Sequence, residues 1–258
     1  MAKRTTAGKI LVVGATGLVG RQLVSRLESA GHEVVPASPS AGVDAATGAG
    51  LADAFAGVEV VIDVSKPHSY GDEAVLRYYR QSTTQLLRAG ADAGVRHHVT
   101  LAAIGTDRLT DSAFYRAKRV QEQLVEASAI PFTLVRSSQF FEFALGIADT
   151  STVEGVVRLP PAPVQPMASS EVADAVAGVA LAAPRGGVVE FAGPERLTLD
   201  GFVRTVLEAR RDPRPVVTDA AASYFGGHPG ADTLVPHAGA TLATVRLTDW
   251  LAHTPTAG

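Results

Sequence analysis

The 258-residue sequence contains no cysteine. This absence excludes disulfide bonds and a thiol nucleophile, and it agrees with a reducing compartment. An excess of one charge is also missing, because 26 acidic residues nearly balance 23 basic ones and the formal net charge is -3. A nearly neutral chain gives no electrostatic reason to expect nucleic acid or an acidic membrane surface as a partner.

Long apolar runs are scarce as well. The apolar segment that follows Lys3, Arg4 and Lys9 could be mistaken for a signal peptide, but glycines and Arg21 interrupt it. It is only about half as long as a membrane-spanning helix, so we interpret it as a strand. We therefore expect a soluble, cytoplasmic protein without a membrane partner. The hydrophobic fraction of 46% suffices for one large domain, or for a domain with a small lobe.

The most informative segment is residues 9–27, KILVVGATGLVGRQLVSRL. It begins with a short β-branched run, typical of a buried strand, and it ends with apolar residues at helical spacing. Between them, Gly14, Gly17 and Gly20 form the pattern G-x-x-G-x-x-G. The order of strand, glycine turn and helix is the context that a dinucleotide-binding fingerprint requires.

Each glycine has its own expected role in this fingerprint. Gly14 permits the bend, Gly17 lets the main chain approach a pyrophosphate, and Gly20 lets the helix pack on the strand. Free N–H groups at the helix start would attract the phosphates. The alternative is a tight turn without a ligand. We favour cofactor binding by the turn residues Gly14, Ala15, Thr16, Gly17, Leu18, Val19 and Gly20.

The tip of the second predicted strand, residues 32–37, bears on which dinucleotide binds. A carboxylate at this tip would bond the ribose 2′-hydroxyl of NAD. Here the tip carries Ser38 and Ser40, and the acidic Glu33 lies at the other end of the strand. We therefore expect NADP, with NAD as the alternative. Both serines could also simply make the turn.

Strands and helices continue to alternate along the first part of the chain. Predicted strands cover residues 58–64, 95–101 and 131–136, and predicted helices cover residues 51–55, 72–93 and 112–128. This order predicts an α/β fold, a doubly wound parallel sheet of the Rossmann type with right-handed crossovers.

Two loops of this predicted sheet supply further candidates. Asp44 is placed to contact an adenine edge, although a turn-forming aspartate is equally compatible with its loop. Residues 65–71 follow the carboxyl end of a strand, where open α/β sheets bind ligands, so Ser65 and His68 are candidates there. His97 and His98 cannot share a metal ion, because adjacent strand residues point to opposite faces. We expect no metal site.

The pattern changes near Gln139, where an aromatic-rich segment precedes the proline-rich LPPAPVQPM. We expect residues 1–138 to form the dinucleotide-binding core. Residues 139–258 should mainly form a small C-terminal substrate-binding lobe, interleaved with the core as one structural unit. Core packing is the default role of its aromatic residues. Predicted elements cover residues 171–183, with Ser170 as N-cap, and 188–191, 199–210, 216–217 and 247–251.

Several segments together carry a family resemblance. They are GATGLVG from Gly14, IGTDRLTDSAFYRAK ending at Lys118, and, further on, IPFTLVRSSQFFEF, EVADAV and FAGPERLT. With them the chain resembles the atypical short-chain dehydrogenase/reductases, specifically the NmrA-like NAD(P)-binding group, over nearly its whole length. We expect a small-molecule substrate, and a monomer or a homodimer.

The resemblance implies a reductase mechanism with a Tyr-x-x-x-Lys pair and a serine. In the wider superfamily the tyrosine gives a proton to the substrate carbonyl oxygen as hydride arrives. The lysine holds the nicotinamide ribose, and the serine bonds the same oxygen. This chain departs from the pattern twice, with Phe114 in the tyrosine position and Ala102 in the serine position. Lys118 matches, and related reductases of the isoflavone-reductase type are thought to use this lysine without a tyrosine partner.

Lys118 and Tyr115 are the catalytic candidates, and Lys118 is also a ribose contact. Tyr115 is rotated by about 100° from Phe114 on the helix. The alternatives are a solvated helix lysine and simple packing of Tyr115. Arg136 and Glu142 could line a pocket or brace a loop. The candidates for substrate binding are His68, Ala102, Phe114, Gln139, Phe140 and Phe141.

Three functions compete at this point. The first is an NAD(P)H-dependent oxidoreductase that reduces a small carbonyl or quinone-like compound, since a quinone needs little positioned acid. The second is a dinucleotide sensor without turnover, like the regulator that names the NmrA family. The third is a non-redox isomerase or cyclase. The lost proton donor favours the second and third, whereas Lys118 and the aromatic-rich second half favour the reductase.

Overall fold

The computed structural model describes residues 8–67, 69 and 71–253. Its main sheet has seven strands in the order β12-β9-β5-β4-β3-β1-β2. β1 pairs in parallel with β2 and β3, β3 with β4, and β9 with β12. The predicted α/β fold is confirmed. The strands are β1 (Lys9–Val13), β2 (Val34–Ala37), β3 (Val58–Asp63), β4 (His97–Ala103), β5 (Phe132–Ser137), β9 (Gly187–Ala192) and β12 (Thr241–Leu242).

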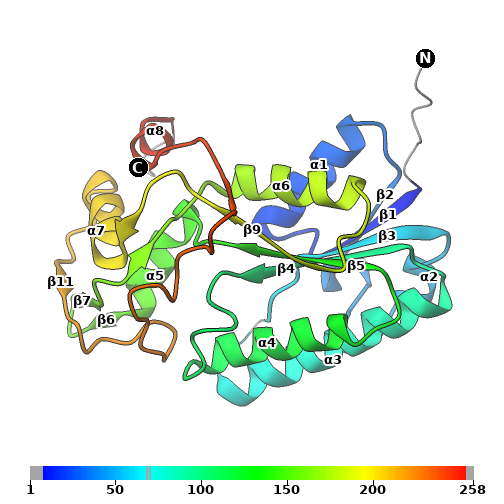
Figure 1. Ribbon diagram of the computed structural model, residues 1–258, viewed down its shortest axis with the longest axis horizontal. Coiled ribbons are helices and arrows are strands. Elements are labelled where there is room, and N and C mark those ends of the chain that lie inside the picture. Colours follow the sequence, from blue (N-terminus) through cyan, green and yellow to red (C-terminus); the bar gives the residue numbers. More distant parts are fainter. Residues whose placement is uncertain (1–7, 68, 70, 254–258) are drawn as a thin grey trace. The chain divides into compact units, whose positions relative to one another are not determined.

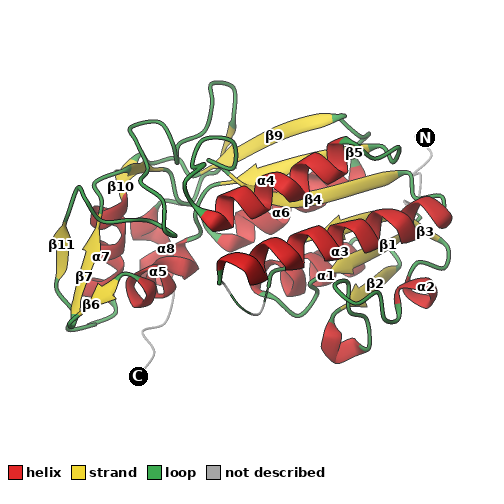
Figure 2. Cartoon of the chain, turned by 90° about the horizontal axis from the view of Figure 1, so that it is seen from below, coloured by secondary structure: helices red, strands yellow, loops and turns green. Residues whose placement is uncertain are grey.

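Helices cover both faces of this sheet (Figures 1 and 2). α1 (Leu18–Ser29) and α6 (Ser169–Leu181) lie on one face, and α3 (Asp72–Asp92) and α4 (Ala113–Glu126) lie on the other. The short helix α2 (Leu51–Ala54) contacts α3. In the described part of the chain, no helix is both long enough and apolar enough to span a bilayer.

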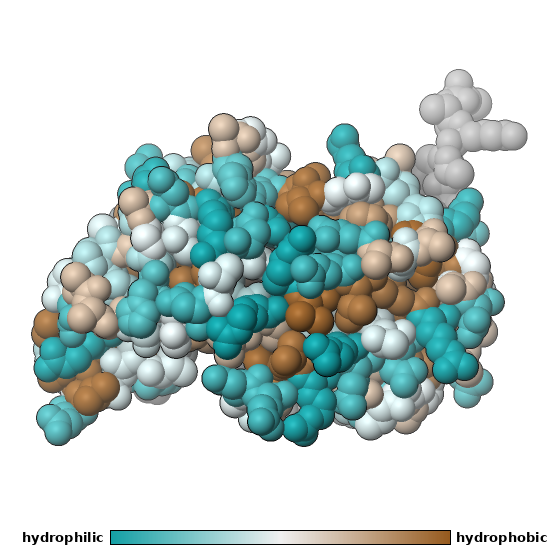
Figure 3. All heavy atoms as spheres, turned by 60° about the horizontal axis from the view of Figure 1, so that its bottom comes forward, coloured by the Kyte–Doolittle hydropathy of each residue, from teal (hydrophilic) through white to brown (hydrophobic). Residues whose placement is uncertain are grey.

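The face with α3 and α4 is turned toward the reader in Figure 3. Hydrophilic residues cover most of it, and hydrophobic residues gather between them. The inner face of α3 is not purely apolar, because Ser82 and Thr83 are buried beside Val75, Tyr79 and Leu86. Within the described residues neither of these two hydroxyls has a hydrogen-bond partner.

The chain divides into two compact units. Unit 1 comprises residues 1–102, 117–135 and 172–189, and unit 2 comprises residues 103–116, 136–171 and 190–258. Unit 2 has its own core, which includes Phe141, Phe202 and Tyr224. Its elements include α5 (Ala144–Thr150), α7 (Leu199–Ala209), α8 (Leu247–His253), the pair β8 (Pro163–Val164) and β10 (Leu197–Thr198), and the sheet of β6 (Thr152–Val153), β7 (Val156–Leu159) and β11 (Val216–Thr218).

Most predicted elements exist, with bounds that shift by one or two residues. β4 begins at His97 instead of residue 95. The reason is that the N–H of Val95 bonds the carbonyl of Gly90, so this residue closes the end of α3. Gly94, at a φ of 72°, makes the left-handed turn that such a helix end requires. Helix α5 and the short strands β6, β7, β8, β10 and β12 had no sequence prediction.

The prediction of Ser170 as the N-cap of α6 is wrong. The helix begins at Ser169, so Ser170 lies in its first turn. Both carboxylate oxygens of Glu142 accept the N–H of Ser169, at 3.2 and 3.1 Å, and Oε1 also accepts its hydroxyl at 2.7 Å. The cap therefore comes from a residue 27 positions earlier in the chain, which local capping rules cannot identify.

We expect Glu142→Ala to lower the free energy of unfolding by about 1 kcal/mol, because the first turn of α6 would lose its acceptor. Glu208→Ala, which removes an exposed carboxylate on α7, is the matched control and should change it little. Chemical denaturation of both variants measures the difference. Equal stabilities would show that the Glu142 cap contributes nothing.

Candidate active site

The glycine turn joins β1 to α1 in unit 1. Gly14 has a φ of 86°, and a Cβ at this position would lie 2.8 Å from the Cα of Ser65. A Cβ at Gly20 would overlap the carbonyl oxygen of Gly14. Both positions require glycine for the fold itself, one for the bend and the other for the close approach of α1.

Gly17 is in a different situation. Its φ of -74° and ψ of 175° suit any residue, and a Cβ here would meet only the carbonyl oxygen of Gly14, at 3.2 Å. Gly17 is the N-cap of α1, where no described side chain caps the helix and the first turn holds no acidic residue. The N–H groups at this helix start are therefore available to an anionic ligand.

Ser65 supplies a polar group beside the turn. Its Oγ is buried, and within the described chain it has no hydrogen-bond partner. A buried hydroxyl of this kind is costly unless water or a ligand bonds it. The uncapped helix start, the open side of Gly17 and the Ser65 hydroxyl together fit a dinucleotide.

The tip of β2 is arranged as a serine pair. Ser38 is buried, Ser40 is exposed, and their hydroxyl oxygens are 3.0 Å apart. Asp44, further along, accepts the N–H of Ala46 on Oδ1 at 2.8 Å. This bond supports the turn-forming interpretation of Asp44, and its adenine contact stays a prediction.

Lys118 points into the interior of unit 1. The residue is 5% exposed, which rules out the solvated helix lysine considered above. Its ammonium group donates to the carbonyl of Leu101 at 2.8 Å and to the side-chain oxygen of Gln121. The nitrogen also lies 4.5 Å from the centroid of the Tyr79 ring. Among the described residues these two acceptors use two of its three N–H donors, and the face of the Tyr79 ring lies beside the cation.

Asp63, at the end of β3, completes this buried group. Its Oδ2 accepts the amide N–H of Gln121 at 3.0 Å, and its Oδ1 accepts the N–H of Ser65 at 3.0 Å. Burial lowers the pKa of Lys118 to about 8, although Asp63 and Glu122 both act to raise it. The sequence contains a feature that could have identified each of the two residues near Lys118. Asp63 ends an apolar strand, and Gln121 is one helical turn after Lys118.

His98 is another buried titratable group that interacts with Asp63. The imidazole is fully buried, and burial lowers its pKa to about 4 despite the attraction of Asp63. It is therefore neutral at physiological pH. His97 bonds Thr133 at 2.9 Å instead. Within the described residues no group of three histidine or acidic side chains could hold a metal ion.

Tyr115 and Phe114 belong to unit 2. Tyr115 is 2% exposed and packs in the core of that unit. Burial raises the pKa of its hydroxyl, and hydrogen bonds with Gln139 and Tyr224 oppose this only in part. Phe114 stacks on Phe225, with ring centroids 5.2 Å apart. This geometry favours packing as the role of Tyr115.

The other candidate residues for substrate binding or pocket lining in unit 2 make structural contacts. Phe141 is 1% exposed and packs against Trp250, and Phe140 stacks on Phe143. Arg136 bonds Asp107 at 2.8 Å. Burial is the largest single influence on the pKa of Asp107 and would raise it, but the bond and charge of Arg136, a backbone hydrogen bond and the charge of Arg108 together lower that pKa. Substrate contacts of these residues stay predictions.

His68 and Ala102 are the other two residues predicted to contact the substrate. His68 lies outside the described residues. Ala102 lies in β4 and is buried, one residue after the carbonyl that binds Lys118. The methyl group of Ala102 cannot bond a substrate oxygen, so the serine function of the superfamily is absent from this position.

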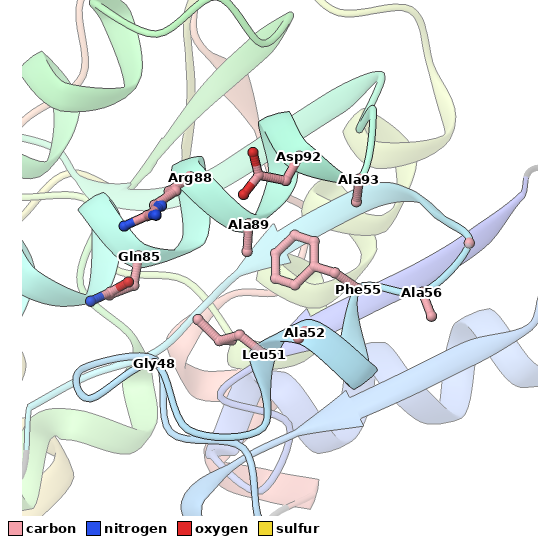
Figure 4. A pocket seen from close by; sticks show the side chains of 11 residues that line it. Gly48, Leu51, Ala52, Phe55, Ala56, Gln85, Arg88, Ala89, Asp92 and Ala93 are labelled. Atoms are coloured by element: carbon pink, nitrogen blue, oxygen red, sulfur yellow. The ribbon is translucent and has the colours of Figure 1, made fainter.

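A hollow of about 420 Å³ lies elsewhere in unit 1, between α2 and α3. Figure 4 shows Phe55 pointing toward α3, and Gln85, Arg88 and Asp92 along that helix. None of the described site candidates lines this hollow. We therefore place the candidate site at the glycine turn and at Lys118, not here.

Comparison with known proteins identifies the family of the chain. Residues 14–182 match the NAD(P)H-binding family. A curated relative from Streptomyces griseus, (4-alkanoyl-5-oxo-2,5-dihydrofuran-3-yl)methyl phosphate reductase, is 32% identical over 207 residues, which are 73% of this chain and 69% of the relative. The family match begins at Gly14 and includes Lys118.

Two solved structures share the fold at low sequence identity. A short-chain dehydrogenase/reductase superfamily protein from Agrobacterium tumefaciens with bound NAD is 16% identical, with a TM-score of 0.67 and 95% of each chain covered. An NADPH-dependent quinone oxidoreductase from Escherichia coli is 18% identical, with a TM-score of 0.63, covering 95% of this chain and 98% of that one. The chain belongs to the NAD(P)H-binding family of atypical short-chain dehydrogenase/reductases and is an NAD(P)-dependent oxidoreductase.

Proposed function

We propose that this protein reduces small conjugated carbonyl compounds or quinones with NADPH, and that Lys118 replaces the Ser-Tyr-Lys set of the superfamily. The observation that carries the proposal is the buried ammonium of Lys118, which has only two hydrogen-bond acceptors among the described residues for its three N–H donors. Bound NAD(P)H supplies the hydride. The ammonium bonds the nicotinamide ribose and offsets negative charge that develops on the substrate oxygen.

The substrate class follows from the missing proton donor. Phe114 has no acidic proton, and the hydroxyl of Tyr115 is buried with a raised pKa. When a quinone or an enone accepts hydride, the charge spreads over a conjugated oxygen, so the protein has to stabilise an anion more than it has to deliver a proton.

Two comparisons support this substrate class. The name of the Streptomyces griseus reductase describes an acyl-substituted dihydrofuranone, in which carbonyl groups adjoin a ring double bond. The Escherichia coli protein of similar fold is named a quinone oxidoreductase.

The matching experiment is a panel of quinones, enones and saturated ketones incubated with NADPH and the purified protein. We expect cofactor oxidation with conjugated acceptors and little with saturated ketones of similar size. Turnover restricted to saturated ketones would contradict the proposed substrate class. Cofactor binding without turnover of any acceptor would favour a sensor or a non-redox enzyme.

We also expect NADP(H) to bind more tightly than NAD(H). The tip of β2 has no carboxylate to repel a 2′-phosphate, and the exposed Ser40 hydroxyl can bond one. Ser40→Asp should weaken NADPH binding by at least about tenfold, a change of roughly 1.4 kcal/mol, and should affect NADH less. Dissociation constants measured in one buffer decide this. A clear preference of the wild type for NADH would overturn the assignment.

A further inference from the structure

Lys118 is buried in unit 1, and in the described part of the chain its ammonium has no direct contact with a carboxylate. Its ammonium reaches Asp63 only through Gln121. The amide of Gln121 satisfies both neighbours at once, because its oxygen accepts from the ammonium and its nitrogen donates to the carboxylate. This arrangement fixes the orientation of the amide and, through it, the position of the ammonium.

We propose that Asp63 and Gln121 are positioning residues that hold the Lys118 ammonium protonated and oriented, an inference that rests on the proposed role of Lys118 in the reductase. Asp63 is 1% exposed and Gln121 is 1% exposed, so their hydrogen bonds are shielded from water. All three residues belong to unit 1.

Asp63 also ties the lysine to the cofactor loop. The same carboxylate accepts the N–H of Ser65, and the backbone of Ser65 lies where a Cβ on Gly14 would touch it. One buried side chain therefore braces the glycine turn and, through Gln121, the ammonium. Loss of its charge should alter the lysine more than it alters the shape of the loop, because asparagine can keep an oxygen for Ser65.

The other charged groups around Lys118 do not replace Asp63. Glu122 is buried on α4, but it is paired with Arg119 at 3.0 Å. His98 on β4 is neutral near pH 7 because burial lowers its pKa to about 4. Tyr79 on α3 offers a ring face, and Leu101 on β4 offers a carbonyl. Asp63 is the carboxylate whose hydrogen bonds lead to the ammonium.

These groups determine in which direction the pKa of Lys118 should change when Asp63 loses its charge. Burial lowers the pKa of Lys118 to about 8, and Asp63 opposes that change. Below this pH the ammonium is charged, and above it the charge is lost. Removing the carboxylate should therefore lower the pKa further, so that the lysine loses its proton at a lower pH.

Selective labelling of lysine side chains makes the pKa of Lys118 directly measurable by NMR. The chain has four lysines, Lys3, Lys9, Lys66 and Lys118, and Lys118→Ala identifies the Lys118 signal by removing it. NMR titration of the full-length protein should place the Lys118 midpoint below the ordinary value of a lysine. Asp63→Asn should lower this midpoint by about one pH unit. Asp53→Asn, on the exposed side of α2, is the matched control and should leave it unchanged.

A second readout comes from turnover. The fall of kcat at alkaline pH should move to lower pH in Asp63→Asn, in parallel with the NMR midpoint. An unchanged Lys118 midpoint in Asp63→Asn would overturn the inference. If Asp63→Asn does not fold, Lys118 is titrated in Gln121→Met instead. A lowered Lys118 midpoint in that variant supports the inference, and an unchanged midpoint overturns it. If the midpoint moves while Lys118→Ala keeps full turnover, the positioning holds and the proposed catalytic role of Lys118 fails.

Discussion

Gly17→Val should fold normally and lose its affinity for both dinucleotides by at least about a hundredfold, a change of roughly 2.7 kcal/mol. The backbone at Gly17 already has a conformation that valine adopts, and the added Cβ meets only one carbonyl oxygen, at 3.2 Å. The new side chain would instead occupy the space before the N-terminus of α1, where we expect the pyrophosphate. Calorimetric titration with NADPH and NADH measures the loss.

The choice of position makes this experiment specific. Gly14 and Gly20 are poor targets, because side chains there would strain or displace the turn and so test folding rather than binding. Gly187→Val is a suitable control, since this glycine begins β9 and a Cβ there meets nothing within 4 Å. Its affinity should equal that of the wild type. Unchanged binding in Gly17→Val would end the fingerprint interpretation.

Local sequence patterns were sufficient for the first strand, the glycine turn and the first helix. The apolar run, the three glycines and the helical spacing each describe one continuous segment, and β1 and α1 lie where they predict. The alternation of strands and helices further along the chain predicted the parallel sheet, because each of those elements is also one continuous segment with its own periodicity. Short strands such as β8 and β10 escaped, because two residues pairing with a distant segment leave no periodicity to detect.

The surroundings of Lys118 could be predicted only in part. The family motif marked the lysine, but its burial depends on contacts with Leu101 and Gln121 that only the fold brings together. Asp63 lies 58 positions before Gln121 in the chain, and no local rule pairs them. The cap of α6 by Glu142 escaped for the same reason.

The position of Tyr115 on its helix was predictable from the sequence, but its role was not. The sequence placed it beside the position of the lost tyrosine, rotated by about 100°. That rotation could have meant either an adapted proton donor or a core residue. Its 2% exposure and its bonds with Gln139 and Tyr224 favour the core residue, a distinction that needed the packing of unit 2.

The second large effect concerns chemistry. Lys118→Ala should lower kcat by at least about tenfold, equivalent to roughly 1.4 kcal/mol of transition-state stabilisation. The reason is that the variant loses the buried ammonium, whose remaining N–H donor we assign to the ligand. Lys9→Ala is the matched lysine control, because Lys9 lies at the start of β1 and pairs with Glu33. It should retain wild-type turnover.

Side-by-side steady-state kinetics of Lys118→Ala and Tyr115→Phe, on the best conjugated acceptor with NADPH, decide which of the two residues is required for turnover. We expect Lys118→Ala to lose at least about tenfold in kcat and Tyr115→Phe to lose clearly less, because its hydroxyl is buried in the core of unit 2. The contradictory result is a Tyr115→Phe variant without activity beside an active Lys118→Ala, which would make Tyr115 the proton donor.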